Sequence, residues 1–355
     1  MKVYIGNISR VFSKPKKELV DFLFPFYNMN QKKETVSSFS QGYELVEMVD
    51  DADFCLLPFP WNYYYTNKCK DEALQFIDDC HKAHKEVVTF TSGDFGVPPL
   101  VKDVIVIRQS GYHSQRLDKQ YALPAFVNDP VERFFEGDVQ FRKKQDKPVV
   151  GFCGQGTSSP FRYAGVFVSN IFRNLKYYLG VSYYEPQDLY PSTLRRNKVL
   201  SFFEKSSLTE TDFIIRQKYR GGAVTEEQRR STALEFYKNM RDTDYTLCLR
   251  GVGNFSVRIY ETLAMGRIPV FVNTDCILPF DQFIDWKSHV VWIDQKDISK
   301  ADEILSEFHL SIHPDDFTGL QAANRELWEK YLSMDGFYSN LPKLINTDSQ
   351  HKLVI

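Results

Sequence analysis

The second half of the chain contains a segment in which an apolar run, a glycine-rich turn, a helical pattern and a second apolar run follow one another. Residues 245–249 (YTLCL) predict a buried strand, and residues 250–254 (RGVGN) predict the turn. A helix is expected over residues 256–265, and residues 268–272 (IPVFV) predict the next strand. A βαβ unit of this kind directs backbone N–H groups and a helix N-terminus toward one point, where phosphate binds.

The two ends of this predicted helix carry start and stop residues. Ser256 or Asn254 is the candidate N-cap, and Gly266 is the candidate stop. The N–H groups of the turn and of the first helical turn have no partner within the helix. We therefore expect Gly251, Asn254 and Ser256 to contact a bound diphosphate.

Two arginines define the kind of phosphate site that is expected. Arg250 ends the first strand, and Arg258 lies in the first turn of the helix, where the helix dipole disfavours a cation unless an anion is near. Glu261 is three residues further on and could pair with Arg258 on a solvated face. Alternatively, the guanidinium binds a diphosphate and the carboxylate binds ribose hydroxyls. The spacing leaves both interpretations open.

Further short motifs follow the predicted helix at defined spacings. Residues 250–286 read RGVGNFSVRIYETLAMGRIPVFVNTDCILPFDQFIDW, with an Arg-Gly pair, a Ser-x-Arg-x-x-Glu helix, a Gly-x-Ile-Pro-Val strand and a Leu-Pro-Phe followed by Asp-Trp. This run resembles the signature of the exostosin family of glycosyltransferases (glycosyltransferase family 47). Weaker similarities lie at residues 52–58, 91–96 and 236–240. The resemblance covers most of the chain and is strongest after about Tyr219.

The resemblance implies a GT-B fold and an enzyme that uses a nucleotide-diphosphate sugar, with a UDP-sugar favoured as the donor. The acceptor would be a hydroxyl of an oligosaccharide or glycolipid, in polysaccharide or glycoconjugate synthesis. Glu261 matches the helix glutamate of the family and is expected to hold ribose. Animal exostosins are membrane-anchored in the Golgi, and this chain shows no such anchor, so a bacterial or viral type of member is expected.

Strands and helices alternate along both halves of the chain. Apolar runs predict strands at residues 2–5, 54–58, 86–90, 104–107 and 148–153, and an amphipathic helix is expected over 71–84. Alternation of this kind favours an α/β fold with two doubly wound, Rossmann-like domains facing a cleft, as in the GT-B architecture.

The charged stretch 142–147 (RKKQDK) before Pro148 is the best linker in the sequence. It predicts an acceptor-binding domain over residues 1–145 and a nucleotide-sugar-binding domain over 146–314. A helix is expected from about residue 315 to 332, and the C-terminal part, 315–355, is expected to pack back onto the first domain by analogy with the fold.

Two further groups of residues are candidates for the donor site. Arg216 and Arg220 precede a glycine pair and form either a solvated loop or a mobile contact to the diphosphate. Gly154, Gly156 and Thr157 form a turn after a predicted strand, and this turn would lie beside the diphosphate or the transferred sugar.

The departing diphosphate gains negative charge, which a divalent metal or fixed cations can stabilise. Metal-dependent transferases usually place Asp-x-Asp at the carboxyl end of a strand. The two matches here, residues 51–53 and 242–244, precede their strands instead. We therefore expect no metal ligands and no cofactor, with Arg250, Arg258 and the helix terminus at Ser256 stabilising the leaving group.

If the reaction inverts configuration, a general base from the first domain must accept the proton of the acceptor hydroxyl. Asp94 is the first candidate because it follows the strand predicted over residues 86–90. His113 and Asp118, after the next strand, are alternatives. The competing interpretation is that Asp94 only begins a turn before Gly96.

Composition and charge limit the classes of partner that the chain is expected to bind. A net charge of −2 indicates no nucleic-acid surface. No apolar run has the length of a membrane helix, although peripheral membrane contact is compatible with the sequence. The six cysteines show no C-x-x-C spacing and no leader peptide is recognised, so a cytoplasmic protein is expected. The aromatic run 61–65 (WNYYY) predicts either domain packing or a sugar-stacking surface.

Two other functions remain open from the sequence. The chain could be another sugar-nucleotide enzyme, such as an epimerase, which needs no acceptor cleft. It could also be a catalytically silent subunit of a polysaccharide synthase that binds carbohydrate or nucleotide. The charged residues of the 250–286 run are all present, which favours an active enzyme.

Overall fold

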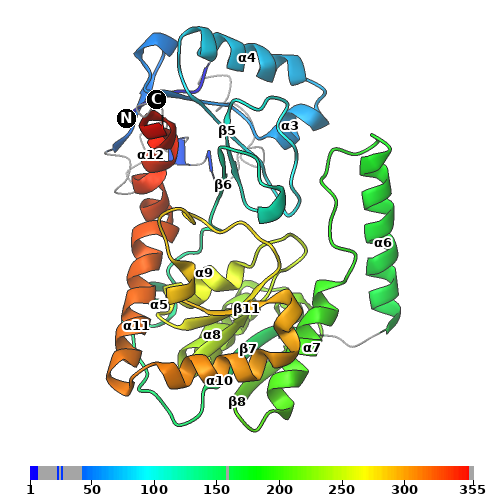
Figure 1. The fold of residues 1–355 in the computed structure, drawn as a ribbon, viewed down its shortest axis with the longest axis vertical. Helices are drawn as coiled ribbons and strands as arrows, with labels where there is room; N and C mark the ends of the chain where they lie inside the picture. The colour runs from blue at the N-terminus through cyan, green and yellow to red at the C-terminus, as the bar shows by residue number, and fades with distance from the viewer. Residues whose placement is uncertain (7–21, 24, 27–41, 157–159, 352–355) are drawn as a thin grey trace.

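The computed structural model describes residues 1–6, 22–23, 25–26, 42–156 and 160–351. Two parallel sheets lie one above the other, each covered by helices, as Figure 1 shows. This arrangement confirms the expected α/β class with two domains in a GT-B-like fold.

The first sheet has the strand order β2-β1-β3-β4-β5-β6, and all of its pairings are parallel. Its strands are β1 (Lys2–Tyr4), β2 (Glu44–Val46), β3 (Phe54–Leu56), β4 (Val87–Phe90), β5 (Ile105–Arg108) and β6 (Gln120–Ala122). The helices α3 (Trp61–Thr66) and α4 (Lys70–Lys82) lie between β3 and β4. The sequence predicted β1, β3, β4, β5 and α4, and these are confirmed. It did not predict the three-residue strands β2 and β6.

The second sheet has the order β8-β7-β9-β10-β11 and is also parallel. Its strands are β7 (Val149–Gln155), β8 (Glu210–Arg216), β9 (Tyr245–Cys248), β10 (Ile268–Asn273) and β11 (Val291–Asp294). The chain passes from β7 to β8 on one side and then returns to β9 on the other side. Ligands in open α/β sheets bind at such a reversal, beyond the carboxyl ends of the two strands. The structure therefore directs attention to the ends of β7 and β9.

The helices that cover this sheet include α7 (Ser192–Lys205), α8 (Glu226–Asp242), α9 (Val257–Ala264) and α10 (Ala301–Ser311). Ser256 is the N-cap of α9, and its side chain forms no capping hydrogen bond. At the other end, Gly266 has a φ of +61°, and its N–H donates to the Leu263 carbonyl while the N–H of Arg267 donates to Thr262. This pair of bonds is a Schellman motif, so the predicted glycine stop is confirmed.

The chain enters the second domain earlier than expected. Helix α5 (Pro130–Phe134) already packs there, although the predicted linker, residues 142–147, comes later in the sequence. The helix contacts α8 and α9, and Val131 packs with Met240 and Met265. Residues 142–147 have no regular structure, but Arg142 is held by Gln321 through hydrogen bonds in both directions. The charged stretch is thus fastened to the second domain.

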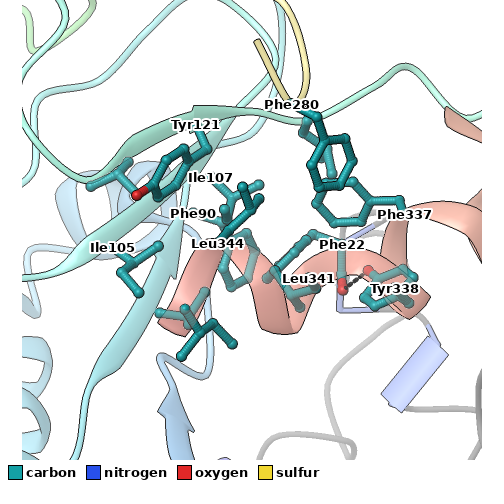
Figure 2. Close-up of a cluster of buried hydrophobic side chains, with 14 of the residues drawn as sticks. Phe22, Phe90, Ile105, Ile107, Tyr121, Phe280, Phe337, Tyr338, Leu341 and Leu344 are labelled. Carbon is teal, nitrogen blue, oxygen red and sulfur yellow. Dashed lines mark hydrogen bonds between the residues drawn. The ribbon is translucent and has the colours of Figure 1, made fainter. Parts of the chain in front are cut away.

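The C-terminal region consists of two helices rather than one. α11 (Pro314–Leu327) packs on α9 and β10, a π-helical turn (Trp328–Leu332) follows, and α12 (Met334–His351) packs on the first sheet. In Figure 1, α12 rises from the second domain to the first. Figure 2 shows its inner face against the strands. The labelled side chains are Phe337, Tyr338, Leu341 and Leu344 from α12, Phe22, Phe90, Ile105, Ile107 and Tyr121 from the first domain, and Phe280 from the segment after β10. The crossing helix is therefore α12, which lies within the region 315–355 that was expected to pack back, but after the helix that was expected over residues 315–332.

No helix within the described residues combines the length and the apolar character that crossing a bilayer requires.

His309 on α10 should make the stability of the fold depend on pH. The ring is buried; its Nε2 lies 2.8 Å from the Gln145 carbonyl and its Nδ1 lies 2.9 Å from the Tyr245 hydroxyl. The carbonyl can only accept, so Nε2 donates and Nδ1 accepts from the tyrosine in the neutral ring. Burial lowers the pKa of His309 from its usual 6.5.

Since the unfolded chain binds this proton more tightly, the free energy of unfolding should fall as the pH drops below about 6.5. The stability that the neutral ring provides should be fully present above that pH. Urea denaturation at a series of pH values measures the effect, and His309→Gln should flatten the curve. An equally steep loss of stability in that variant would contradict the assignment.

Candidate active site

A cavity of about 1410 Å³ opens at the carboxyl ends of β7 and β9, where the strand order reverses. Its lining contains more cations than anions among the described residues. The charged lining residues are Arg133, Arg196, Arg216, Arg229, Arg230 and Arg258, with Asp94, Glu226 and Glu261. Six arginines against three carboxylates leave a surplus of three positive charges. Such a cavity attracts anions.

Arg258 on α9 is one of the arginines that line this cavity, at the ends of β7 and β9. Its Nη2 donates to the Cys153 carbonyl at 3.0 Å and its Nη1 to the Leu247 carbonyl at 3.4 Å, so it bridges the ends of β7 and β9. The guanidinium lies over the Phe152 ring, 4.4 Å from its centroid, and 5.6 Å from that of Phe236. Burial lowers the pKa of Arg258. The group is thus fixed in position by backbone acceptors and aromatic faces.

Arg196 on α7 is a second fixed cation, and sequence analysis did not identify it. Its Nη1 donates to the Gln155 carbonyl at 2.8 Å and its Nη2 to the Arg250 carbonyl at 3.4 Å. It also lies over Phe152, 5.7 Å from the centroid. Burial, together with the charge of Arg258, lowers the pKa of Arg196 to about 10.

These two guanidinium groups share one aromatic ring, and within the described ranges neither forms an ion pair with a carboxylate. The Nε atoms of Arg196 and Arg258 are both buried and have no hydrogen-bond partner in the described structure. An unsatisfied buried donor is costly, and two neighbouring like charges repel one another. A multivalent anion such as a diphosphate, bound in the cavity, would relieve the repulsion between the two cations.

Gly154 makes room for Arg258. A Cβ atom at this position would come within 2.7 Å of Nη2 of Arg258. The glycine after the strand, predicted to lie beside the diphosphate, therefore allows the guanidinium to approach β7. Gly154 also lines the cavity.

We expect Gly154→Ala to weaken nucleotide-diphosphate binding about tenfold, because the methyl group must displace the guanidinium and small displacements in a binding site are costly. Isothermal titration calorimetry measures the change. Gly319→Ala is the matched control, since a Cβ atom there meets nothing within 4 Å. Unchanged affinity in Gly154→Ala would show that the position of Arg258 does not determine binding.

The glycine turn and the start of α9 form the adjacent part of the wall. Gly251, Ser256 and Glu261 all line the cavity, as the sequence predicted for a donor site. Glu261 accepts a hydrogen bond from the Tyr237 hydroxyl at 3.3 Å. No ion pair joins Glu261 to Arg258 in the described part of the chain. The simple intrahelical bridge is therefore not formed, and both side chains face the cavity.

Arg216 also lines the cavity, at the end of β8. Its Nη2 donates to the Thr232 carbonyl at 2.8 Å and lies 2.5 Å from the Glu235 carboxylate. Its charge is therefore partly balanced within the protein. The side chain of Arg220 and the whole of Thr157 lie outside the described residues.

Three other candidates do not line the cavity. Arg250 is buried and donates to the Tyr112 hydroxyl (3.3 Å) and to the Gln187 side chain (3.1 Å). Asn254 is fully buried, and its amide donates to the Gly111 carbonyl at 2.9 Å. Gly156 is buried under α7. Arg250 and Asn254 thus connect the turn to the first domain, although both were expected to contact the diphosphate.

Asp94 also lines the cavity and belongs to the first domain. It follows β4, is exposed to solvent, and its main chain abuts the turn of the second domain: a Cβ atom on Gly253 would come within 2.2 Å of the Asp94 carbonyl oxygen. His113 and Asp118, the alternative bases, are also exposed but do not line the cavity. Of the three candidate bases, Asp94 is therefore the one that lines the cavity.

Both Asp-x-Asp matches lie at the amino ends of strands, as expected. Asp53 accepts the N–H of Lys2 at the start of β1, at 2.7 Å. Asp244 accepts the N–H of Val149 at the start of β7, at 3.3 Å, and pairs with Arg142. These carboxylates face away from the cavity and hold strand ends together.

The aromatic run on α3 serves mainly in packing. Trp61 is fully buried and donates its indole N–H to Thr89 at 3.1 Å, and Tyr64 is buried in the core of the first domain. Tyr65 stacks on Tyr183, with ring centroids 4.8 Å apart. These contacts agree with the domain-packing interpretation of this run.

Comparison with known families covers the same region. Residues 172–308 match the family described as the Exostosin GT47 domain. The match contains β8, β9, α9, β10 and β11, and thus the cavity-lining residues Arg196, Arg258 and Glu261. It does not contain Asp94 or Gly154.

Individual proteins show the same similarity over shorter segments. A probable glucuronosyltransferase of Oryza sativa subsp. japonica and a probable beta-1,4-xylosyltransferase of Arabidopsis thaliana are each 35% identical to this chain over 71 residues, which is 20% of the chain and 17% of each relative. Exostosin-1 of Drosophila melanogaster is 28% identical over 106 residues, 30% of the chain and 13% of the fly protein. The similarity thus spans less than a fifth of the length of each relative.

Proposed function

We propose that this protein is a glycosyltransferase that moves a sugar from a nucleotide-diphosphate sugar to a hydroxyl of a carbohydrate acceptor. The observation that supports this most directly is the pair formed by Arg196 and Arg258, two buried cations with unpartnered Nε atoms at the strand reversal. The match to the Exostosin GT47 domain over the same wall supports the same reaction class.

In this proposal the second domain binds the donor. Arg196 and Arg258 hold the diphosphate, and the N-terminus of α9 at Ser256 adds the positive end of the helix dipole. Glu261 holds the ribose hydroxyls from the same helix. As the glycosidic bond breaks, the growing negative charge on the diphosphate is met by these fixed groups.

We propose that this stabilisation does not require a divalent metal, since the fixed arginines can take its place and both Asp-x-Asp pairs hold strand ends elsewhere. Transfer that persists undiminished in EDTA is the expected result.

The first domain then provides the acceptor side. Asp94, which lines the same cavity as Arg258, would accept the proton of the attacking hydroxyl. Attack from the face opposite the leaving diphosphate inverts the anomeric configuration. Product analysis by NMR, which reads the anomeric coupling of the new linkage, tests inversion.

UDP is the proposed nucleotide, and an oligosaccharide or a glycolipid the proposed acceptor. The family resemblance supports UDP, and the plant relatives are named as glucuronosyl- and xylosyltransferases. We also propose a reducing, cytoplasmic setting, supported by six cysteines that are all free thiols. A bacterial or viral origin stays a prediction, because the relatives named above come from plants and an insect.

The decisive experiment is a thermal-shift series with UDP, GDP and their sugars, with and without EDTA, followed by a transfer assay with the stabilising donor. The expected result is stabilisation by UDP that EDTA does not remove, since a ligand that binds the folded state raises its melting temperature. Absence of stabilisation by every nucleotide diphosphate would overturn the proposal. Stabilisation without transfer to any acceptor would instead identify a silent nucleotide-binding subunit.

A further inference from the structure

Helix α6 (Pro160–Tyr178) runs along the side of the molecule, as Figure 1 shows, and attaches to it through its polar residues. Asn174 donates to the Gln187 carbonyl at 2.8 Å and accepts the Gln187 N–H at 2.9 Å. Asn170 donates to the Asp188 carbonyl at 3.0 Å. Arg173 lies over the Phe95 ring of the first domain, 4.2 Å from the centroid.

The apolar residues of α6 and of the turn after it face away from the protein. Phe172 is 60% exposed, Leu175 is 49% exposed and Tyr178 is 74% exposed. The other large apolar side chains exposed on this side are Phe167, Val168, Ile171, Leu179 and Val181. We call this set, from Phe167 to Val181, the outer face of α6.

This orientation is the reverse of that in an ordinary surface helix, which buries its apolar stripe and presents polar residues to water. The hydrogen bonds of Asn170 and Asn174 fix the helix in the reversed orientation. Contiguous apolar patches of this kind mark surfaces that another molecule covers.

The charge of the segment indicates what covers it. Residues 157–184 contain no aspartate or glutamate, but contain Arg162, Arg173 and Lys176. The first carboxylate after them, Glu185, is paired with Arg108. Arg173 lies against Phe95, so Lys176 is the described cation that is exposed beside the outer face. An apolar helix face beside a cation, in a segment without carboxylates, is complementary to a membrane surface with anionic lipids.

A second copy of the chain fits this surface less well. Two outer faces in contact would bring their cations together without any carboxylate from either segment. The tyrosines at the end of the helix, such as Tyr177 and Tyr178, are also typical of the boundary between lipid and water, because each has an apolar ring and a polar tip.

We propose that α6 docks the protein on an anionic membrane surface, with its outer face inserted among the lipids and its axis in the plane of the membrane. Gln155, at the end of β7, and Ser192, at the start of α7, both line the cavity, and α6 lies in the chain between them. Docking through α6 therefore brings the cavity close to the membrane. If the proposed function holds, the acceptor is a glycolipid in that membrane.

Sedimentation of the full chain with phosphatidylcholine vesicles, with and without phosphatidylglycerol, tests the docking. We expect binding to the anionic vesicles that decreases as salt is raised. Phe172→Asp combined with Leu175→Asp should reduce the partition coefficient by about a hundredfold or more, since burial of each apolar side chain is worth at least about tenfold. Lys176→Glu should reduce the preference for anionic vesicles by about fivefold or more.

The matched control is Leu310→Asp on α10, an exposed leucine outside the outer face, which should bind vesicles as the parent chain does. Because Phe172 and Leu175 are exposed, the double variant should keep its melting temperature and its stabilisation by UDP. Loss of vesicle binding with UDP stabilisation retained supports docking independently of the proposed function. The proposal would be overturned if the parent chain did not bind vesicles, or if the double variant bound them equally well.

Light scattering measures the alternative. If the parent chain is a dimer and the double variant is a monomer, a second copy of the chain covers the outer face instead of a membrane.

Discussion

Arg258→Ala should lower the kcat of sugar transfer by about a hundredfold to a thousandfold, the usual effect of removing one fixed group that stabilises developing negative charge. The guanidinium is held by the Cys153 and Leu247 carbonyls and by the Phe152 ring. It therefore needs no reorganisation when the diphosphate departs. Steady-state kinetics with the donor identified by thermal shift measure the change.

Two further variants separate charge from geometry. Arg258→Lys keeps the cation but loses the planar group that stacks on Phe152, so its activity should fall between those of the parent chain and Arg258→Ala. Arg241→Ala is the control, because Arg241 pairs with the neighbouring Asp242 and does not line the cavity. Full activity in Arg258→Ala would remove this residue from the donor site.

Asp94→Asn should lower kcat by about a hundredfold to ten-thousandfold, the range that general base catalysis contributes. The amide is similar in shape to the carboxylate but cannot accept the proton of the attacking hydroxyl. Because Asp94 is exposed and comes from the first domain, donor binding and the melting temperature should change little.

The matched substitution Asp118→Asn, in the same domain but outside the cavity, should leave kcat unchanged. If Asp94→Asn lowered donor affinity but not kcat, Asp94 would be part of the donor site instead of the base. If it changed neither quantity, the base would have to come from elsewhere on the first-domain wall.

The donor βαβ unit could be predicted from sequence because local rules determine it. The continuous apolar run predicted β9, and the glycine at position 266 predicted the end of α9. In the structure Gly266 is left-handed and the Schellman hydrogen bonds form there. The switch in apolar periodicity from strand to helix carries this information without any distant contact. Ser256, Arg258 and Glu261 then follow from their positions in one short helix.

The direction of a side chain within the motif could not be predicted in the same way. Arg250 and Asn254 lie in the same short turn as Gly251, but their side chains bind Tyr112 and Gly111 of the first domain. The partners lie far away in sequence, so nothing in the local pattern distinguishes a residue that binds a ligand from one that joins two domains.

Arg196 shows a second limit. It lies in a helix with little amphipathic pattern, in a run that also contains Arg195, and Arg195 pairs with Asp188 instead. Only the packing of α7 beside β7 brings Arg196 to Phe152 and Arg258. The sequence does contain two adjacent arginines in the segment that connects β7 to β8. The pattern alone does not indicate which of the two faces the cavity.

The contribution of α12 to the first sheet has a consequence for biosynthesis. Strands β1 to β6 are translated long before α12, yet Phe337, Leu341 and Leu344 complete their hydrophobic core. The sheet that leaves the ribosome first must therefore wait, with apolar surface uncovered, for the helix that leaves among the last. Domains commonly fold in order of synthesis, but this one cannot finish in that order. We therefore expect folding during translation to depend on chaperones. The first domain should be the part that needs them, even though it is translated before the second domain.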